Sequence, residues 1–157
     1  MTADNPLLVA FHDTPRATPL LPWLISGGQP SERDLVAAQA AGLVAVIDIR
    51  DPMEPRPFEE PEAIAALGVA YVNLPVVSGD LSDRLMDEIL AALRQHAGTP
   101  TLLHCASANR VGGPTIAYLM LDHHVPEADA VDIAMRAGLR SAELMEWAID
   151  YAKRHET

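Results

Sequence analysis

Cysteine and aromatic residues are scarce in this chain of 157 residues. Cys105 is the only cysteine, so an internal disulfide is excluded, which fits a reducing compartment. Aromatic residues make up 4% of the chain, so the core has to be built mostly from Leu, Val, Ile, Ala and Met. Hydrophobic residues reach 49%, which is enough for one domain of ordinary size without a disulfide or a metal.

Positive charge is scarce as well, with 11 Lys and Arg against 22 Asp and Glu and a formal net charge of −11. This excess repels nucleic acid and anionic membranes, so neither is an expected partner. It also repels phosphate-bearing ligands at long range, so any anion site has to be local and built around arginine. No apolar run is long enough to span a bilayer, and Met1 to Phe11 lacks the basic region of a signal peptide. We therefore expect a cytoplasmic protein.

Strand and helix patterns alternate along the chain. Residues 1–20 contain three prolines and little periodicity, so we expect a mostly irregular arm. The remaining pattern predicts strands at 23–26, 43–49, 69–74 and 101–104, and helices at 31–41, 62–67, 81–93, 114–121, 127–137 and 141–155. The run 43–49 is apolar and β-branched, which is typical of a strand buried on both faces. We expect one α/β domain over 1–157, with three layers and a mainly parallel sheet of about four or five strands flanked by helices.

The loop His104-Cys105-Ala106-Ser107-Ala108-Asn109-Arg110 follows a predicted parallel strand and precedes a helix that begins near Pro114. Ligands bind at the carboxyl ends of such strands. Backbone N–H groups of a tight strand-to-helix loop can form an anion nest, and the helix dipole stabilises a thiolate. Arg110 can hold a tetrahedral oxyanion through two N–H groups. The pattern therefore favours Cys105 as a nucleophile, although a lone cysteine is also often an inert buried thiol.

This loop and two other segments resemble the protein tyrosine phosphatase superfamily, most closely the phosphatase-like domains of the bacterial β-lactamase-hydrolase-like family. The other two segments are Ser26-Gly27-Gly28-Gln29-Pro30-Ser31 and Val46-Ile47-Asp48-Ile49-Arg50 with Glu54 after it. The resemblance covers about 25–137 and implies a phosphotyrosine protein phosphatase-like fold. It also implies that a phosphomonoester is hydrolysed through a phosphocysteine on Cys105, without a cofactor.

The family pattern implies a role for each loop residue. Cys105 would attack phosphorus, while Arg110 and the backbone of Ala106, Ser107, Ala108 and Asn109 would bind the phosphoryl oxygens. His104 would support the loop through a hydrogen bond to its backbone, although it also fits a satisfied histidine at a strand end. The resemblance implies a small phosphorylated molecule or a phosphoprotein as the partner.

Three departures from the family pattern affect the expected turnover. Ala106 and Ala108 replace the arginine and the glycine of the family's loop, and an alanine forced to a positive φ costs about 1 kcal/mol. Val111 stands where many phosphatases carry Ser or Thr. Four residues separate Cys105 from Arg110, whereas most tyrosine phosphatases have five.

Carboxylates near the predicted site include a candidate for the acid that protonates the leaving group. We assign this role to Asp80, with Asp83 second, although either fits a helix start instead. Asp48 would need a partner if buried, and Arg50 is expected to be a poor one because neighbouring strand residues face opposite sides. Arg50 and Glu54 form either an ion pair near the site or a solvated turn. The acidic run 59–62 is expected to be a solvated face.

Two other function classes remain open. A six-residue loop that starts at cysteine is also the size associated with rhodanese-type sulfurtransferases, in which Cys105 would carry a persulfide. Alternatively, Ala106, Ala108 and Val111 mark a catalytically impaired module that binds an anion or a protein. No metal site is expected, because adjacent His123 and His124 on a helix do not converge on one ion. The helix predicted at 141–155 is expected to pack on the core, with a homodimer face as the alternative.

Overall fold

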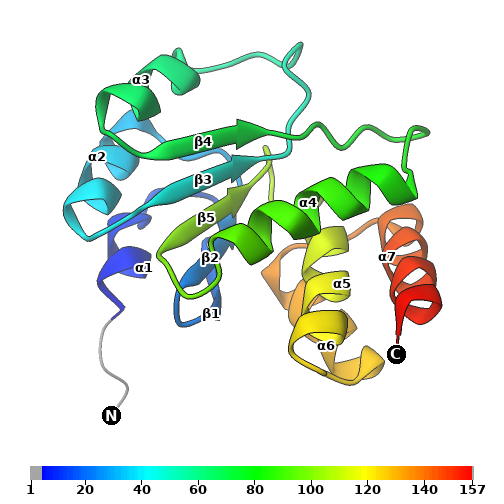
Figure 1. The fold of residues 1–157 in the computed structure, drawn as a ribbon. Coiled ribbons are helices and arrows are strands. Elements are labelled where there is room, and N and C mark those ends of the chain that lie inside the picture. Colours follow the sequence, from blue (N-terminus) through cyan, green and yellow to red (C-terminus); the bar gives the residue numbers. More distant parts are fainter. Residues whose placement is uncertain (1–4, 157) are drawn as a thin grey trace.

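The computed structural model describes residues 5–156 and has a five-stranded sheet at its centre (Figure 1). The strand order is β1-β2-β5-β3-β4, with β1 antiparallel to β2 and every other neighbour parallel. The strands are β1 (Thr18–Leu21), β2 (Leu24–Gly27), β3 (Ala45–Asp48), β4 (Ala70–Asn73) and β5 (Thr101–His104). The prediction of a mainly parallel α/β sheet is confirmed.

Helices cover both faces of this sheet, which gives three layers (Figure 1). One face carries α1 (Pro6–Ala10), α2 (Glu32–Ala40) and α3 (Glu60–Ala66). The other face carries α4 (Asp83–Gln95), α5 (Gly112–Asp122), α6 (Glu127–Ala137) and α7 (Ala142–His155). Within residues 5–156, no helix combines the length and apolar character needed to cross a membrane.

Serine side chains fix the starts of three of these helices. The hydroxyl oxygens of Ser31, Ser82 and Ser141 each accept a hydrogen bond from the backbone N–H three residues later, at 3.0, 3.1 and 3.3 Å respectively. Each bond satisfies one of the donors that a helix leaves unpaired at its N-terminus. The cap at Ser31 confirms the predicted start of α2.

Each strand in the middle of the sheet contributes side chains to two apolar cores, because successive side chains point to opposite faces. Leu102 joins the core beneath α1–α3, and Leu103 joins the larger core beneath α4–α7. Val46 and Ile47 divide in the same way, and all four residues of β3 are buried. This pattern confirms that the 43–49 segment forms a strand covered on both faces.

Two elements were not foreseen from the sequence. The segment expected to be a mostly irregular arm holds α1 and the start of β1, while residues 1–4 of that arm lie outside the described residues. The pairing of β1 with β2 is a tertiary contact that local periodicity does not encode. The C-terminal helix α7 packs on the core, with Leu144, Ala148 and Tyr151 buried.

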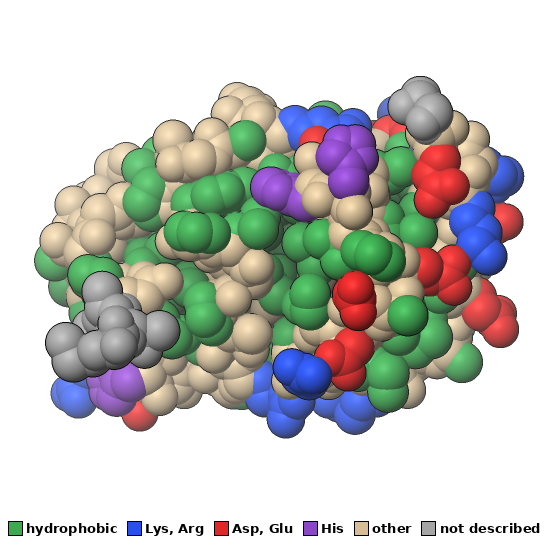
Figure 2. All heavy atoms as spheres, turned by 90° about the horizontal axis from the view of Figure 1, so that it is seen from below, with side chains coloured by type: hydrophobic (Ala, Val, Ile, Leu, Met, Phe, Trp, Pro, Cys, Tyr) green, Lys and Arg blue, Asp and Glu red, His purple; other side chains and the backbone are tan. Residues whose placement is uncertain are grey.

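Exposed charges of both signs gather over the C-terminal helices, as the view from below shows (Figure 2). Arg94 pairs with Asp122 at 2.7 Å, and Lys153 pairs with Glu127 at 3.3 Å. Exposed pairs of this kind contribute little to stability, about 0–1 kcal/mol each. The folding free energy therefore comes from the two apolar cores rather than from this surface.

Candidate active site

The cysteine loop lies at the carboxyl end of β5, between β2 and β3. The N–H of Cys105 donates to the carbonyl of Gly27 at 3.2 Å, and the N–H of Ile49 donates to the carbonyl of His104 at 2.9 Å. These two bonds extend the parallel pairing past the strand ends and hold Cys105 in line with β5. The loop then runs directly into α5 at Gly112.

The backbone N–H groups of residues 106–111 find no hydrogen-bond acceptor within residues 5–156. Ala108 adopts φ 69°, in the left-handed region. Successive N–H groups in a turn that alternates between right- and left-handed conformations form a concave anion-binding nest. The loop is therefore shaped to bind an anion with its backbone.

Two glycines allow neighbouring segments to approach this loop closely. A Cβ on Gly28 would lie 2.5 Å from the carbonyl oxygen of Ala106, and one on Gly138 would lie 2.8 Å from that of Ala108. The N–H of Gln29 donates to the same Ala106 oxygen at 2.9 Å. The loop is thus held from outside, which lets Ala108 keep its strained backbone conformation.

Arg110 and Glu54 form a bidentate ion pair beside Cys105. Nη1 of Arg110 donates to Oε2 of Glu54, and Nη2 donates to Oε1 at 2.8 Å. This arrangement uses one hydrogen of each terminal nitrogen and leaves the Nε edge of the guanidinium free for a second acceptor. Of the two sequence-based readings of Glu54, an ion pair near the site is the one observed, but its partner is Arg110 instead of Arg50.

This ion pair shifts the titration of both partners. Hydrogen bonds to Glu54 raise the pKa of Arg110 above its ordinary value despite partial burial, and the nearby Cys105 acts in the same direction. Hydrogen bonds from Arg110 lower the pKa of Glu54. Glu54 is therefore held ionised at neutral pH and is unsuited to donate a proton there. Its arrangement fits a role in orienting Arg110.

Beside the ion pair lies a cavity of about 440 Å³. Its lining brings together residues from the β3–α3 loop, the β4–α4 loop, the cysteine loop and the start of α7: Asp51, Glu54, Val76, Val77, Ser78, Asn109, Arg110, Ser141, Glu143 and Leu144. Asp80 is exposed and is not part of this lining. The Cys105 residue is fully buried and does not line the cavity either, so a ligand in it first meets Arg110 and Asn109.

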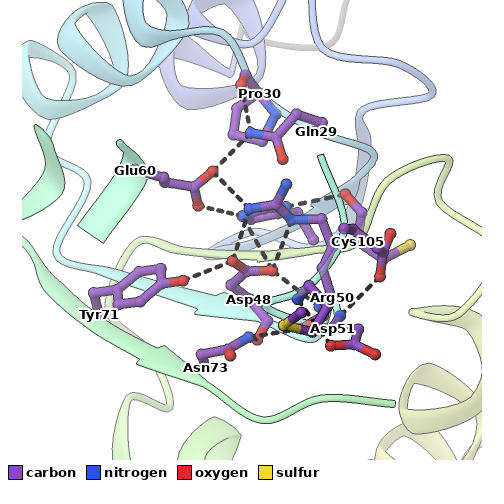
Figure 3. A network of polar contacts seen from close by, with 12 residues as sticks. Gln29, Pro30, Asp48, Arg50, Asp51, Glu60, Tyr71, Asn73 and Cys105 are labelled. Atoms are coloured by element: carbon purple, nitrogen blue, oxygen red, sulfur yellow. Dashed lines mark hydrogen bonds and ion pairs between the residues drawn. The ribbon is translucent and has the colours of Figure 1, made fainter. Parts of the chain in front are cut away.

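Beneath the loop lies a buried polar network of Asp48, Arg50, Glu60 and His104, hereafter the support network (Figure 3). Arg50 donates to both oxygens of Asp48 at 3.1 Å and to Glu60 at 3.4 Å. The expectation that Arg50 would be a poor partner for Asp48 was wrong. The two residues are two positions apart, so they share a side, and the strand ends at Asp48.

His104 connects the support network to the loop. Its Nε2 lies 2.6 Å from Oε2 of Glu60, and its Nδ1 lies 3.1 Å from the carbonyl oxygen of Cys105. A carbonyl only accepts, so Nδ1 carries the hydrogen in this contact. The expectation that the 59–62 run is a solvated face was wrong at Glu60, which is fully buried, because α3 begins there and turns the residue inward.

Tyr71 and Gln29 complete the network, and neither was singled out from the sequence. The Tyr71 hydroxyl donates to Asp48 at 2.7 Å, and Gln29 Nε2 donates to Glu60 at 2.7 Å. Burial raises the pKa of Asp48, but His104 and the hydrogen bonds from Arg50 and Tyr71 outweigh this and hold it below its ordinary value. Each buried carboxylate is therefore surrounded by donors, as a stable buried charge requires.

Comparison with known proteins gives one family and a set of similar folds. The family model for the phosphatase-like domain of the beta-lactamase hydrolase-like protein matches residues 20–115. No curated protein matches the chain. A putative phosphatase from Shewanella putrefaciens CN-32 has a similar structure, with 19% identity, a TM-score of 0.81, and coverage of 96% of this chain and 99% of that one.

Two further solved structures share the fold. Tk-PTP in its active form is 22% identical, with a TM-score of 0.78, and the alignment covers 89% of this chain and 98% of that one. TpbA of P. aeruginosa, solved in complex with pTyr, is 16% identical, with a TM-score of 0.68 and coverage of 99% and 88%. These likenesses confirm the predicted phosphotyrosine phosphatase-like fold.

Proposed function

Because the chain belongs to the family of phosphatase-like domains of beta-lactamase hydrolase-like proteins, we propose that it is a cysteine-dependent phosphatase. The observation that carries the proposal is the cysteine loop, where the backbone N–H groups of residues 106–111 have no acceptor within residues 5–156 and stand next to Arg110. Three negatively charged oxygens of a phosphoryl group match such a site.

The proposed reaction has two steps. The Cys105 thiolate attacks phosphorus, so that the P–S bond forms while the bond from phosphorus to the ester oxygen breaks, and the leaving oxygen takes a proton from a carboxylic acid. Water then attacks phosphorus, breaks the P–S bond and releases inorganic phosphate. In both steps the loop N–H groups and the free edge of Arg110 stabilise charge on the equatorial oxygens.

For the acid that protonates the leaving group, a carboxylate that lines the cavity is a better candidate than Asp80. Three carboxylates line the cavity, and of these Glu54 is committed to Arg110 while Glu143 accepts from Ser78 at 2.9 Å. Asp51 accepts the N–H of Met53 through Oδ1 only, so Oδ2 has no donor within residues 5–156. We therefore assign the acid to Asp51 and keep Asp80 as the comparison.

The decisive experiment is hydrolysis of an aryl phosphate by the wild type and by Cys105→Ser. We expect the variant to lose at least about 10³-fold in kcat because the nucleophile is removed. Asp51→Asn is expected to lower kcat by about 10²-fold for a poor leaving group, and Asp80→Asn to leave it within about twofold. Equal turnover by wild type and Cys105→Ser would exclude the mechanism, and a larger loss in Asp80→Asn would return the acid to Asp80.

The full burial of Cys105 favours one second candidate function, an anion-binding module without turnover. The unpaired N–H groups and Arg110 suffice to bind phosphate whether or not the sulfur is reached. This candidate is distinguished by calorimetry with inorganic phosphate. Binding by a wild type that hydrolyses no aryl phosphate supports it, and turnover that depends on Cys105 excludes it.

A further inference from the structure

Charged side chains of both signs stand around the cysteine loop. The cavity is lined by three carboxylates, those of Asp51, Glu54 and Glu143, and by Arg110. The turn between α6 and α7, which leads into the cavity residue Ser141, carries Arg140, whose guanidinium contacts the exposed Ser107 of the loop. The loop therefore has a second cationic group that the proposed reaction does not use.

Arg140 is held by two hydrogen bonds to the loop and a third within its own turn. Its backbone N–H donates to Oδ1 of Asn109 at 2.6 Å, Nη2 donates to Oγ of Ser107 at 3.0 Å, and Nη1 donates to the carbonyl of Gly138 at 3.1 Å. Ser107 is two residues from Cys105 and belongs to the N–H nest. These contacts place the guanidinium beside the proposed phosphoryl site, with three of its five N–H hydrogens still free.

Arg140 is one of four arginines that have no carboxylate within 4.0 Å in residues 5–156. Seven of the 11 lysines and arginines lie within 4.0 Å of a carboxylate. Arg140 has no such partner within residues 5–156, and each acceptor of its side chain is a neutral oxygen. With a net charge of −11 repelling anions at long range, an unpaired guanidinium beside an anion nest raises the local affinity for negative charge.

A second arginine without a carboxylate partner contacts the end of α6, next to this turn. Arg16 donates from Nη2 to the carbonyl of Arg136 at 2.6 Å, on the last turn of α6, and it too has no carboxylate within 4.0 Å in residues 5–156. Its neighbour Pro15 approaches Gly28, which itself contacts Ala106 of the loop. The segment before β1 and the α6–α7 turn therefore both bring positive charge close to the loop.

We infer that Arg140 binds a second anionic group of the substrate, and that the substrates are phosphomonoesters carrying a phosphate or carboxylate next to the reacting phosphoryl group. The statement about substrates rests on the proposed phosphatase function, whereas the anion subsite at Arg140 does not depend on it. A planar guanidinium binds either group through two parallel N–H bonds. Arg140 would thus select doubly anionic compounds over simple monoesters.

The test is calorimetric binding to protein carrying Cys105→Ser, which cannot turn the probes over. Inorganic phosphate serves as the single-anion probe, with pyrophosphate and phosphonoacetate as probes that add a phosphate or a carboxylate. We expect at least one of these to bind about 10-fold tighter than phosphate, and Arg140→Gln to abolish that gain while phosphate affinity stays within about twofold. The probe with the larger gain identifies the second group.

The matched control is Arg33→Gln, which removes the same charge from the exposed face of α2 and should preserve the gain. Equal binding of all three probes, or a gain that survives Arg140→Gln, overturns the inference. Equal weakening of all three by Arg140→Gln also overturns it, because that shows loop support alone. Hydrolysis of an aryl phosphate by wild type is measured in parallel, so an inactive wild type with an intact Arg140-dependent gain would reject the phosphatase and keep the subsite.

Discussion

The support network beneath the loop and the ion pair at its mouth handle charge in different ways. In the support network, Asp48, Arg50, Glu60 and His104 are at most 3% exposed and share several hydrogen bonds. At the mouth, the side chains of Arg110 and Glu54 are 22% and 29% exposed, and Glu54 has one further donor, the backbone N–H of Asp51 at 2.8 Å. The buried groups have one stable arrangement, whereas the mouth can exchange Glu54 contacts for a ligand. The support network therefore fixes the position of the cysteine loop, while the ion pair at the mouth is the part that can respond to a ligand.

The largest effect is expected from breaking the support network. Glu60→Gln removes a charge that Arg50 and His104 share, and loss of one partner from a buried ionic network costs about 3–5 kcal/mol. Denaturant unfolding measures this loss. Glu62→Gln on the exposed side of the same helix is the control and should change stability by less than about 0.5 kcal/mol. Similar values for the two variants would contradict the proposed importance of burial.

The next effect is expected at Gly28, which packs against the loop at Ala106. Gly28→Ala forces a Cβ against the Ala106 carbonyl, which would lie only 2.5 Å away, and overpacking of this kind costs about 1–3 kcal/mol. Because the displaced carbonyl belongs to the same peptide group as the N–H of Ser107, which is part of the anion nest, phosphate affinity should also fall. Gly98→Ala has open space around its Cβ but a φ of 83°, so it should lose stability without losing phosphate affinity. A loss of affinity in both variants would show a general effect of instability.

At the mouth, Glu54→Gln is expected to separate function from stability. Arg110 and Glu54 are only partly buried, and solvent screening limits such an ion pair to about 1 kcal/mol, so the free energy of unfolding should change less than in Glu60→Gln. Arg110 would no longer be oriented by two hydrogen bonds, and kcat/KM for an aryl phosphate should fall about 10- to 100-fold. A loss of stability as large as that of Glu60→Gln would contradict the view that the mouth contributes less to folding stability than the support network.

The smallest effect is the pH dependence of that same ion pair. The pKa of Glu54 is lowered from its ordinary value of 4.5, so the folded state favours the ionised carboxylate. Its stabilising contribution is therefore complete above about pH 4.5 and is lost as pH falls through the lower folded-state value. The stability difference between wild type and Glu54→Gln should narrow below that pH in urea titrations. A stability difference between the two proteins that grows as the pH falls would show that the pKa of Glu54 is shifted in the opposite direction.

Much of the fold follows from local patterns in the sequence. The strand at 101–104 and the helix at 127–137 were predicted to the residue, because short apolar runs and bounding Gly and Pro residues mark both. The strand β1 was missed because its partner is β2, and its own segment contains Pro19 and little alternation. Periodicity reports which face an element buries, and it does not report which element lies across from it.

For the site, the sequence predicted the position of the backbone loop but not the partners of its side chains. The loop 104–110 and its position after β5 follow from the chain itself, and the positive φ of Ala108 was expected from the glycine at this place in the family pattern. The partners of Arg50 and Arg110 do not follow in this way, since Glu60 and Glu54 reach them across loops of irregular conformation. Glu60 in particular was one acid in an acidic run, and only the start of α3 decides that this one turns inward.

The contacts of the α6–α7 turn bear on where this domain can be cut. The family match ends at residue 115, yet Gly138 packs on Ala108, Arg140 binds Asn109, and Ser141 and Leu144 line the cavity. A fragment trimmed to the matched region would retain Cys105 and Arg110 and lose one wall of the pocket they serve. For truncation, domain grafting or the choice of an expression boundary, the smallest unit that preserves the site extends through α7.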